Sequence, residues 1–371
     1  MNSSTINPSN RRQFLAALAI KAAALSTLAA GEPAADYDFA TMIQPVPLTA
    51  KFSDPDYYIW CGTLVKGDDA KYHLFYSRWP RKLGFNAWVT HSEIAHAVGD
   101  TPLGPFKHRD VALPPRGKEF WDGLCTHNPT INNFGGKYYL YYMGNTGDGV
   151  PMKNLNWTHR NNQRIGVAVA NSPNGPWTRL DRPVVDVSPD DAAPDALMTS
   201  NPTFCERLGG GYLILYKAVG KRNKMPFGGP VVHLTATADS LTGPMTKKLR
   251  PTFTAPGAAF PAEDPYIWLD KSTRRYYAIV KDQNGHFTPQ RGRSLILWES
   301  TDGFDWKLAA HPMVTTNLIH WADGRKQMLE NLERPQLFFE NGRPAVLLCA
   351  VAEDGKLEHS YNIQIPLRPT P

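Results

Sequence analysis

The chain has 371 residues, 42% of them hydrophobic and 20% charged, with 32 prolines, 29 glycines and a formal charge of +6. This composition excludes a disordered chain and a collagen-like one. The positive charge is not concentrated, because the densest basic cluster is the short segment 247–250. The composition therefore argues against a nucleic-acid partner, and the many aromatics and prolines favour short strands joined by tight turns.

The N-terminus reads as a targeting segment. Arg11 and Arg12 are followed by Phe14 and Leu15 and then by an Ala/Leu run to residue 30. A basic region before a short apolar run is typical of a signal peptide, and the paired arginines resemble the twin-arginine export signal. We therefore expect a signal peptide over residues 1–30, and a periplasmic or secreted protein with no membrane attachment after cleavage. Its removal would halve the formal charge.

The cysteines leave two possibilities open. The chain has four, Cys61, Cys125, Cys205 and Cys349, and an exported protein could join them in two disulfides. Their wide spacing and apolar surroundings favour buried free thiols. No CxxC pair indicates a zinc site.

Two markers recur in phase along the chain. The first is a polar residue before proline that opens an apolar run, at Asp54, Asn128, Asn201, Asp264 and Arg334, with spacings of 74, 73, 63 and 70 residues. The second is a glycine turn, Gly-Pro in three of four copies, at Gly104, Gly175, Gly243 and Gly303. Internal repetition of this kind indicates a repeat architecture.

Further strands follow each first marker. Second strand-like runs occupy 71–76, 137–142, 212–216, 275–280 and 344–349, and third runs appear at 165–170 and 294–299. Four short strands per unit predict an all-β, five-bladed β-propeller with mostly four-stranded antiparallel blades around a central channel. We expect one domain over residues 36–371, closed by pairing of 361–365 with a strand near 40–48.

The residues that open the innermost strands should surround the channel. These are Asp54, Asn128, Asn201, Asp264 and Arg334, with Glu263 and Glu333 beside two of them. Carboxylates gathered around an arginine shift one another's pKa, which is common in active sites. The alternative is that short polar residues before proline only cap turns.

These strand openings, the Lys-Tyr-Tyr-Leu-Tyr-Tyr run at 137–142 and the Ser-Pro-Asn-Gly-Pro-Trp turn at 172–177 resemble the five-bladed glycosidases of glycoside hydrolase families 43, 62, 32, 68 and 117. In family 43 an Asp opening blade one is the general base, an Asp opening blade two tunes pKa, and a Glu in blade three is the general acid. The resemblance places Asp54 at the base position. Asn128 and Asn201 depart from the pattern, and Glu206 is the nearest acid in blade three.

The acids lie instead in blades four and five. We expect Asp54 to act as base or nucleophile, Glu263 or Glu333 as acid and Asp264 as the group that tunes them. Arg334 would bind a substrate hydroxyl or carboxylate. The resemblance also draws attention to His127, because family 117 uses a histidine acid. The other expected substrate-binding residues are Asp56, Trp60, Trp121, Asn128, Asp148, Asn201 and Lys217.

The expected activity is exo-type hydrolysis of a plant or algal oligosaccharide, furanoside- or galactoside-like. Two alternatives remain open: a lyase that uses Arg334, Lys217 and His127 on a uronate, and a propeller that binds sugar without catalysis. No cofactor is indicated with certainty. A divalent ion such as Ca²⁺ in the axial channel is a possibility suggested by relatives of this fold, although the sequence shows no ligand set for it.

Overall fold

The computed structural model describes residues 37–288, 293–355 and 357–368. The expected signal peptide, residues 1–30, lies outside this part of the chain. The described residues from Tyr37 onward fall in one unit by their contacts. In the described part, no helix combines the length and the apolar character needed to cross a membrane.

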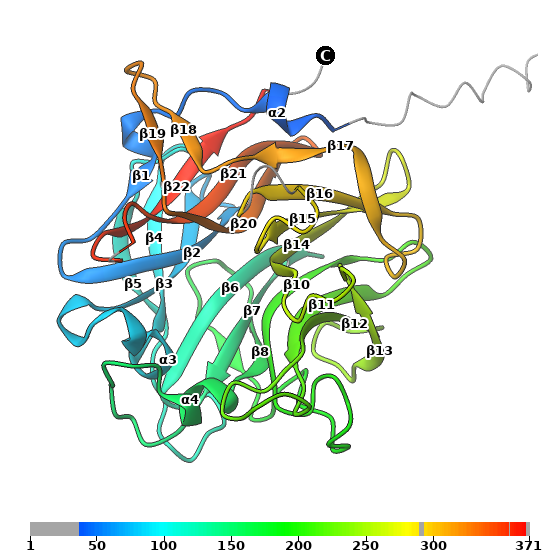
Figure 1. Cartoon of the computed structure of the whole chain (residues 1–371). Coiled ribbons are helices and arrows are strands. Elements are labelled where there is room, and N and C mark those ends of the chain that lie inside the picture. The colour runs from blue at the N-terminus through cyan, green and yellow to red at the C-terminus, as the bar shows by residue number, and fades with distance from the viewer. Residues whose placement is uncertain (1–36, 289–292, 356, 369–371) are drawn as a thin grey trace, which may run out of the picture. The chain divides into compact units, whose positions relative to one another are not determined.

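Five four-stranded antiparallel sheets follow one another around a centre, as the colours of Figure 1 show. Blade I contains β2 (Tyr57–Lys66), β3 (Tyr72–Pro80), β4 (Glu93–Gly99) and β5 (Lys107–Leu113). Blade II contains β6 (Cys125–Phe134), β7 (Lys137–Asn145), β8 (Arg164–Ala170) and β9 (Thr178–Arg179). Blade III contains β10 (Met198–Glu206), β11 (Tyr212–Val219), β12 (Val231–Ala238) and β13 (Thr246–Thr252). The predicted five-bladed propeller is confirmed.

Blade IV contains β14 (Ala262–Asp270), β15 (Arg275–Asp282), β16 (Leu295–Ser300) and β17 (Lys307–Thr315). Blade V contains β20 (Asn331–Glu340), β21 (Arg343–Ala352), β22 (Ser360–Pro366) and the early strand β1 (Lys51–Phe52). The first and the last strands of the described residues, β1 and β22, thus pair and close the ring within one sheet. The closing strand lies at β1, later than the expected 40–48 segment, which instead contains the short helix α2 (Phe39–Met42) and an isolated bridge from Ile43 to Leu367.

The remaining elements are short. A hairpin of β18 (Leu318–His320) and β19 (Lys326–Met328) precedes blade V. Two short helices, α3 (Trp88–His91) and α4 (Trp157–Asn161), follow the second strands of blades I and II. The described residues also contain three 3₁₀ turns: η1 (Leu48–Ala50), η2 (Arg81–Leu83) and η3 (Phe85–Ala87).

Each innermost strand contains a bulge at the same place. The pairing register shifts between β2 and β3, β6 and β7, β10 and β11, β14 and β15, and β20 and β21. The bulged residue has a positive φ in every blade: Cys61, Asn128, Asn201, Asp264 and Arg334, with φ between 48° and 54°. Four of the five precede proline, which needs no ladder donor at a bulge.

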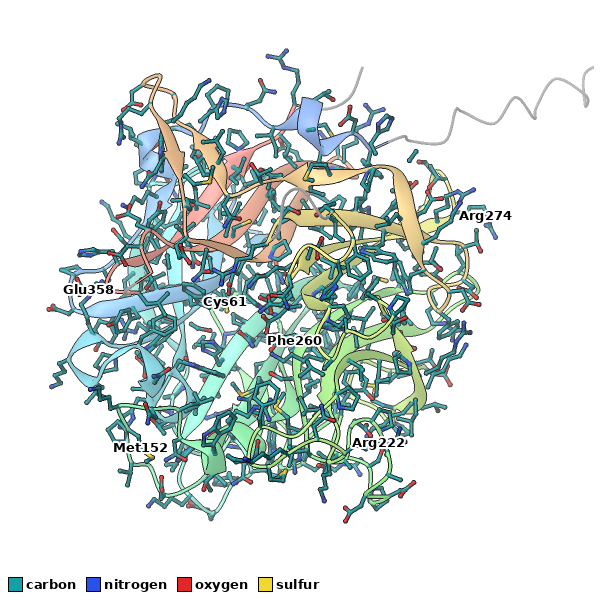
Figure 2. All side chains as sticks on the ribbon, in the orientation of Figure 1. Cys61, Met152, Arg222, Phe260, Arg274 and Glu358 are labelled. Carbon is teal, nitrogen blue, oxygen red and sulfur yellow. The ribbon has the colours of Figure 1, made fainter. Side chains whose placement is uncertain are left out.

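Blade I is the exception to the sequence pattern. Its bulge is formed by Cys61, which precedes Gly62 rather than proline. Figure 2 labels Cys61 near the middle of the propeller. The placement expected for Asp54 at the axial ring is therefore wrong. Asp54 lies before β2, where its Oδ1 accepts the backbone N–H of Asp56 at 2.8 Å and thereby holds a turn.

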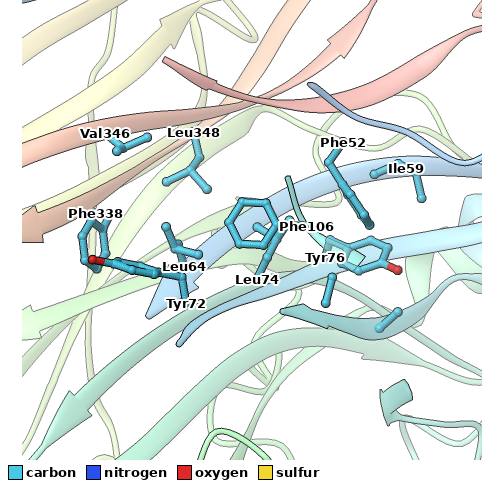
Figure 3. Packing of buried hydrophobic residues seen from close by; sticks show 12 residues of the cluster. Phe52, Ile59, Leu64, Tyr72, Leu74, Tyr76, Phe106, Phe338, Val346 and Leu348 are labelled. Atoms are coloured by element: carbon cyan, nitrogen blue, oxygen red, sulfur yellow. The ribbon is translucent and has the colours of Figure 1, made fainter. Parts of the chain in front are cut away.

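Apolar side chains fill the spaces between adjacent blades. Figure 3 shows the cluster between blades I and V, in which Tyr72 packs edge-on against Phe338 with ring centroids 5.6 Å apart. Leu74 and Leu348 are fully buried in the same cluster. Burial of aromatic and aliphatic side chains between two blades stabilises the contact between them. This packing therefore holds the innermost strands at fixed positions around the axis.

Candidate active site

Four hydrogen bonds join the five bulged residues in an open ring around the axis. Cys61 Sγ donates to Asn128 Oδ1 at 2.8 Å, Asn128 Nδ2 donates to Asn201 Oδ1, and Asn201 Nδ2 donates to Asp264 Oδ1 at 2.6 Å. Arg334 Nη1 donates to the same Asp264 oxygen at 3.3 Å. Because all five side chains are buried, these bonds replace water that the groups would otherwise need.

A cavity of about 350 Å³ lies on one side of this ring. This volume is within the range of small-ligand sites. Its charged lining consists of Arg160, Lys217, Glu263, Asp264, Glu333 and Arg334. Its aromatic lining consists of Trp60, Trp79, Phe85, Trp88, Trp157, Phe227 and Phe260. Figure 2 places Phe260 beside the centre of the propeller. Aromatic faces beside hydrogen-bonding groups suit a ligand that is apolar on one face and polar at its edges, such as a sugar.

Two glutamates of the cavity lie beside one lysine. Lys281, on β15, contacts the carboxylate of Glu333 and lies 3.8 Å from Glu263 Oε2. Glu263 also pairs with Lys217 Nζ at 2.6 Å. Both lysines sit on second strands directly opposite the residue that precedes a bulge, since Lys217 faces Ser200 and Lys281 faces Glu263. The repeat thus places Lys–Glu contacts at the cavity wall.

These contacts separate the pKa values of the two glutamates. Burial opposes ionisation of Glu263, but Lys217 and Lys281 outweigh it and lower its pKa to about 2. Burial raises the pKa of Glu333, and the charges of Glu263 and Asp264 add to that rise despite the attraction of Lys281. Glu263 ionises first because two ammonium groups face it. The site therefore holds one ionised carboxylate beside a carboxyl that retains its proton more readily.

Asp264 belongs to both the ring and the acid group. Burial and the charge of Glu263 raise its pKa, and Arg334 acts in the opposite direction. Arg334 is itself buried, and its Nε and Nη2 have no hydrogen-bond partner in the described structure. Two nitrogens of this guanidinium are thus shielded from solvent without a hydrogen-bond partner in the described structure.

His127 lines the cavity next to the ring. Its Nδ1 is 2.7 Å from Ser92 Oγ, and its ring packs beside Trp79 and Trp88. Burial, together with the charge of Arg334, holds its pKa well below the usual value. A histidine acts as a general acid in its protonated imidazolium form. Because His127 is held neutral here, its environment does not favour that role.

The structure brings together most of the residues expected at the site and separates four of them. Trp60, His127, Asn128, Asn201, Lys217, Glu263, Asp264, Glu333 and Arg334 line the cavity. Asp54, Asp56, Trp121 and Asp148 do not line it. Asp56 is exposed, Trp121 stacks on Tyr142, and Asp148 accepts hydrogen bonds within the loop after β7.

The donor set of the axis does not fit a divalent cation. No group of three or more His, Cys, Asp or Glu in the described ranges could hold a metal ion. The Asp264 carboxylate already accepts from Asn201 and Arg334, and the guanidinium would repel a cation beside it. We derive no step through a metal.

The four cysteines are free and buried. Of the two possibilities that the sequence left open, the structure has the buried thiols and not the disulfides.

Arg160 and Lys281 are functional candidates that sequence reasoning missed. Lys281 directly follows the apolar run 275–280, and it occupies the same position in blade IV as Lys217 does in blade III. This equivalence could have indicated it from the sequence. Arg160 lies on α4, inside a long loop without repeat symmetry. No comparable signal marked it.

No family model matches the sequence, and no curated protein is similar enough in sequence to match it. The structure resembles a family 117 glycoside hydrolase from the marine bacterium Zobellia galactanivorans, with a TM-score of 0.58, 18% identity, and 88% of this chain and 89% of that chain covered. It also resembles an endo-arabinase from Bacteroides thetaiotaomicron (TM-score 0.54, 11% identity, 87% and 97% covered). It resembles an alpha-L-arabinofuranosidase from Lactobacillus brevis as well, with a TM-score of 0.54, 11% identity, and 89% of this chain and 94% of that chain covered. At these identities the likeness concerns the fold.

Proposed function

We propose that this protein is a glycoside hydrolase with its active site in the axial cavity. The observation that carries the proposal is the pair Glu263 and Glu333, which line one cavity, lie beside the same Lys281 and have pKa values shifted in opposite directions. Glycoside hydrolysis needs one carboxylate and one carboxylic acid flanking the scissile bond. The fold shared with several glycoside hydrolases supports the same reaction.

Each glutamate has one role in this mechanism. Glu333 protonates the leaving oxygen, because its raised pKa keeps the proton available. Glu263 either activates a water molecule or attacks the anomeric carbon, since its lowered pKa keeps it ionised. The first course inverts the anomeric centre and the second retains it. Proton NMR of the first product formed distinguishes them. Asp54 has no place in this mechanism, because it lies outside the cavity.

The proposed substrate is an oligosaccharide of the furanoside or galactoside type, attacked at a chain end. The hydrogen-bonded side chains from Asn128 to Arg334 form part of the cavity wall, and we place the terminal sugar against them. Trp60 and Phe260 offer aromatic faces for stacking. Export through the twin-arginine route, to the periplasm or beyond, is proposed from the sequence of residues 1–30, and a plant or algal polysaccharide would be met there.

The test is turnover of a panel of plant and algal oligosaccharides, with reducing ends measured. We expect Glu263→Gln and Glu333→Gln each to lower kcat/KM by about 10²–10⁴. Asp54→Asn is the matched control: it removes one carboxylate, keeps the turn acceptor and should retain activity. An unsaturated product absorbing in the ultraviolet would instead show a lyase. Sugar binding without turnover of any panel member would refute catalysis.

A further inference from the structure

The charged residues of the cavity do not pair completely. Glu263 pairs with Lys217 at 2.6 Å, Asp264 with Arg334 at 3.3 Å, and Glu333 with Lys281. Each acid of the cavity thus has its own cation. Arg160 lines the same cavity but forms no ion pair with any described residue.

Arg160 is held in place by contacts that leave its charge unbalanced. Its Nη1 donates to Phe227 O at 2.7 Å and to Asn161 Oδ1 at 2.9 Å. Its guanidinium lies 5.6 Å from the ring centroid of Trp157 and 5.0 Å from that of Phe227. The residue is only 6% exposed. Burial lowers its pKa to about 10, and the charge of Glu263 acts in the opposite direction. Arg160 is therefore a charged, nearly buried group near neutrality without a carboxylate partner.

Unpartnered donor nitrogens lie in the cavity wall, shielded from solvent. Gln163 Nε2 and the Nε and Nη2 of Arg334 have no hydrogen-bond partner in the described structure, and both residues line the cavity. Burying a cation without an anion is costly, and unpartnered buried donors add to that cost. A ligand that brings a negative charge to Arg160 removes the first of these penalties.

We propose that the sugar bound in this cavity is anionic, and that Arg160 pairs with its carboxylate or sulfate oxygens. This inference rests on the proposed function for the view that the ligand is a sugar. A guanidinium suits such a group because its planar N–H fork matches two oxygens at once. Lys217 and Arg334 are already paired with acids, so Arg160 determines the preference for charge.

The experiment compares binding of matched sugars to the full protein by ligand-observed NMR or calorimetry. Galacturonate and galactose 6-sulfate are set against galactose, and glucuronate against glucose, so the two anionic arms distinguish carboxylate from sulfate. We expect at least one anionic sugar to bind more tightly than its neutral counterpart. Arg160→Met should weaken that binding about 10- to 100-fold and leave neutral sugars unchanged, and Arg160→Lys should restore part of it.

Arg222→Met is the control, because Arg222 is exposed, lies on a nearby loop and does not line the cavity. It removes the same charge and should keep the preference. Equal binding of anionic and neutral sugars, or unchanged binding in a folded Arg160→Met variant, overturns the inference. Turnover of neutral oligosaccharides with no preference for anionic ones would overturn the inference and leave the proposed hydrolase intact. Arg160-dependent binding of anionic sugars without any hydrolysis would support the inference and refute the proposed hydrolase function.

Discussion

Lys217 Nζ lies 2.6 Å from Glu263 Oε1, and this contact joins the second strand of blade III to the first strand of blade IV. The ammonium group is one of two that lower the pKa of Glu263 to about 2 against the effect of burial. The ionised state of Glu263 therefore depends on a neighbouring blade, and removal of the lysine changes the pH range in which Glu263 is a carboxylate.

Lys217→Met should raise the pKa of Glu263. Because Glu263 acts in its ionised form, the acidic limb of the kcat/KM profile should move to higher pH. The control is Lys221→Met, since Lys221 is exposed and pairs with Asp191 away from the cavity. A profile of Lys217→Met that overlays the wild-type curve would contradict the assignment of Glu263 as the ionised group.

Glu333→Gln should lose the proton donor but not the nucleophile or base. Substrates with poor leaving groups should lose about 10²–10⁴ in kcat/KM, whereas aryl glycosides with acidic leaving groups should lose much less, because they need no protonation. The basic limb of the pH profile should disappear as well. Rates for a series of aryl leaving groups provide the measurement. Equal losses across the series would exclude Glu333 as the acid.

Asp264→Asn should destabilise the propeller more than a surface change would. The variant leaves Arg334 buried without its carboxylate, and breaking such a pair costs about 3–5 kcal/mol. The free energy of unfolding, from urea titration, measures the effect. Adding Arg334→Met should recover part of the loss, because the uncompensated charge is then gone. If the double variant is no more stable than the single one, the ring is held by something other than this charge pair.

The sequence repeat predicted the fold because its markers reflect local backbone geometry. Four bulges carry a polar residue with positive φ followed by proline, as at Asn128, Asn201, Asp264 and Arg334. In blade I the bulge consists of Cys61 and Gly62, so the marker is absent, and Asp54-Pro55 imitates it seven residues earlier. A turn and a bulge can use the same dipeptide, and only strand pairing tells them apart.

Site residues that come from loops were harder to predict from the sequence than those on the innermost strands. Glu263 and Glu333 stand next to the markers, and the repeat therefore indicated them. Arg160 comes from α4 in the loop between β7 and β8, and its position depends on a contact with Phe227 from the loop of another blade. Contacts between irregular loops of different blades have no period along the chain, so the sequence pattern carries no sign of them.

His233 should make the protein sensitive to acid. It is fully buried opposite Lys217, its Nε2 has no hydrogen-bond partner in the described structure, and burial followed by the charge of Lys217 lowers its pKa to about 3. The unfolded chain binds that proton near the ordinary pKa of about 6.5. The contribution of neutral His233 to stability is thus complete above pH 6.5 and is lost as the pH falls from 6.5 toward 3.

His233→Leu removes this proton linkage and fills the same apolar space beside Phe253. Wild-type protein should lose about 2–3 kcal/mol more of its free energy of unfolding than the variant between pH 7 and pH 4.5, since each pH unit is worth about 1.4 kcal/mol. Urea titrations of both proteins at the two pH values measure the difference. His127 is unchanged in both, so its own contribution cancels. Parallel losses in the two proteins would show that His233 binds its proton equally well in the folded and unfolded chain.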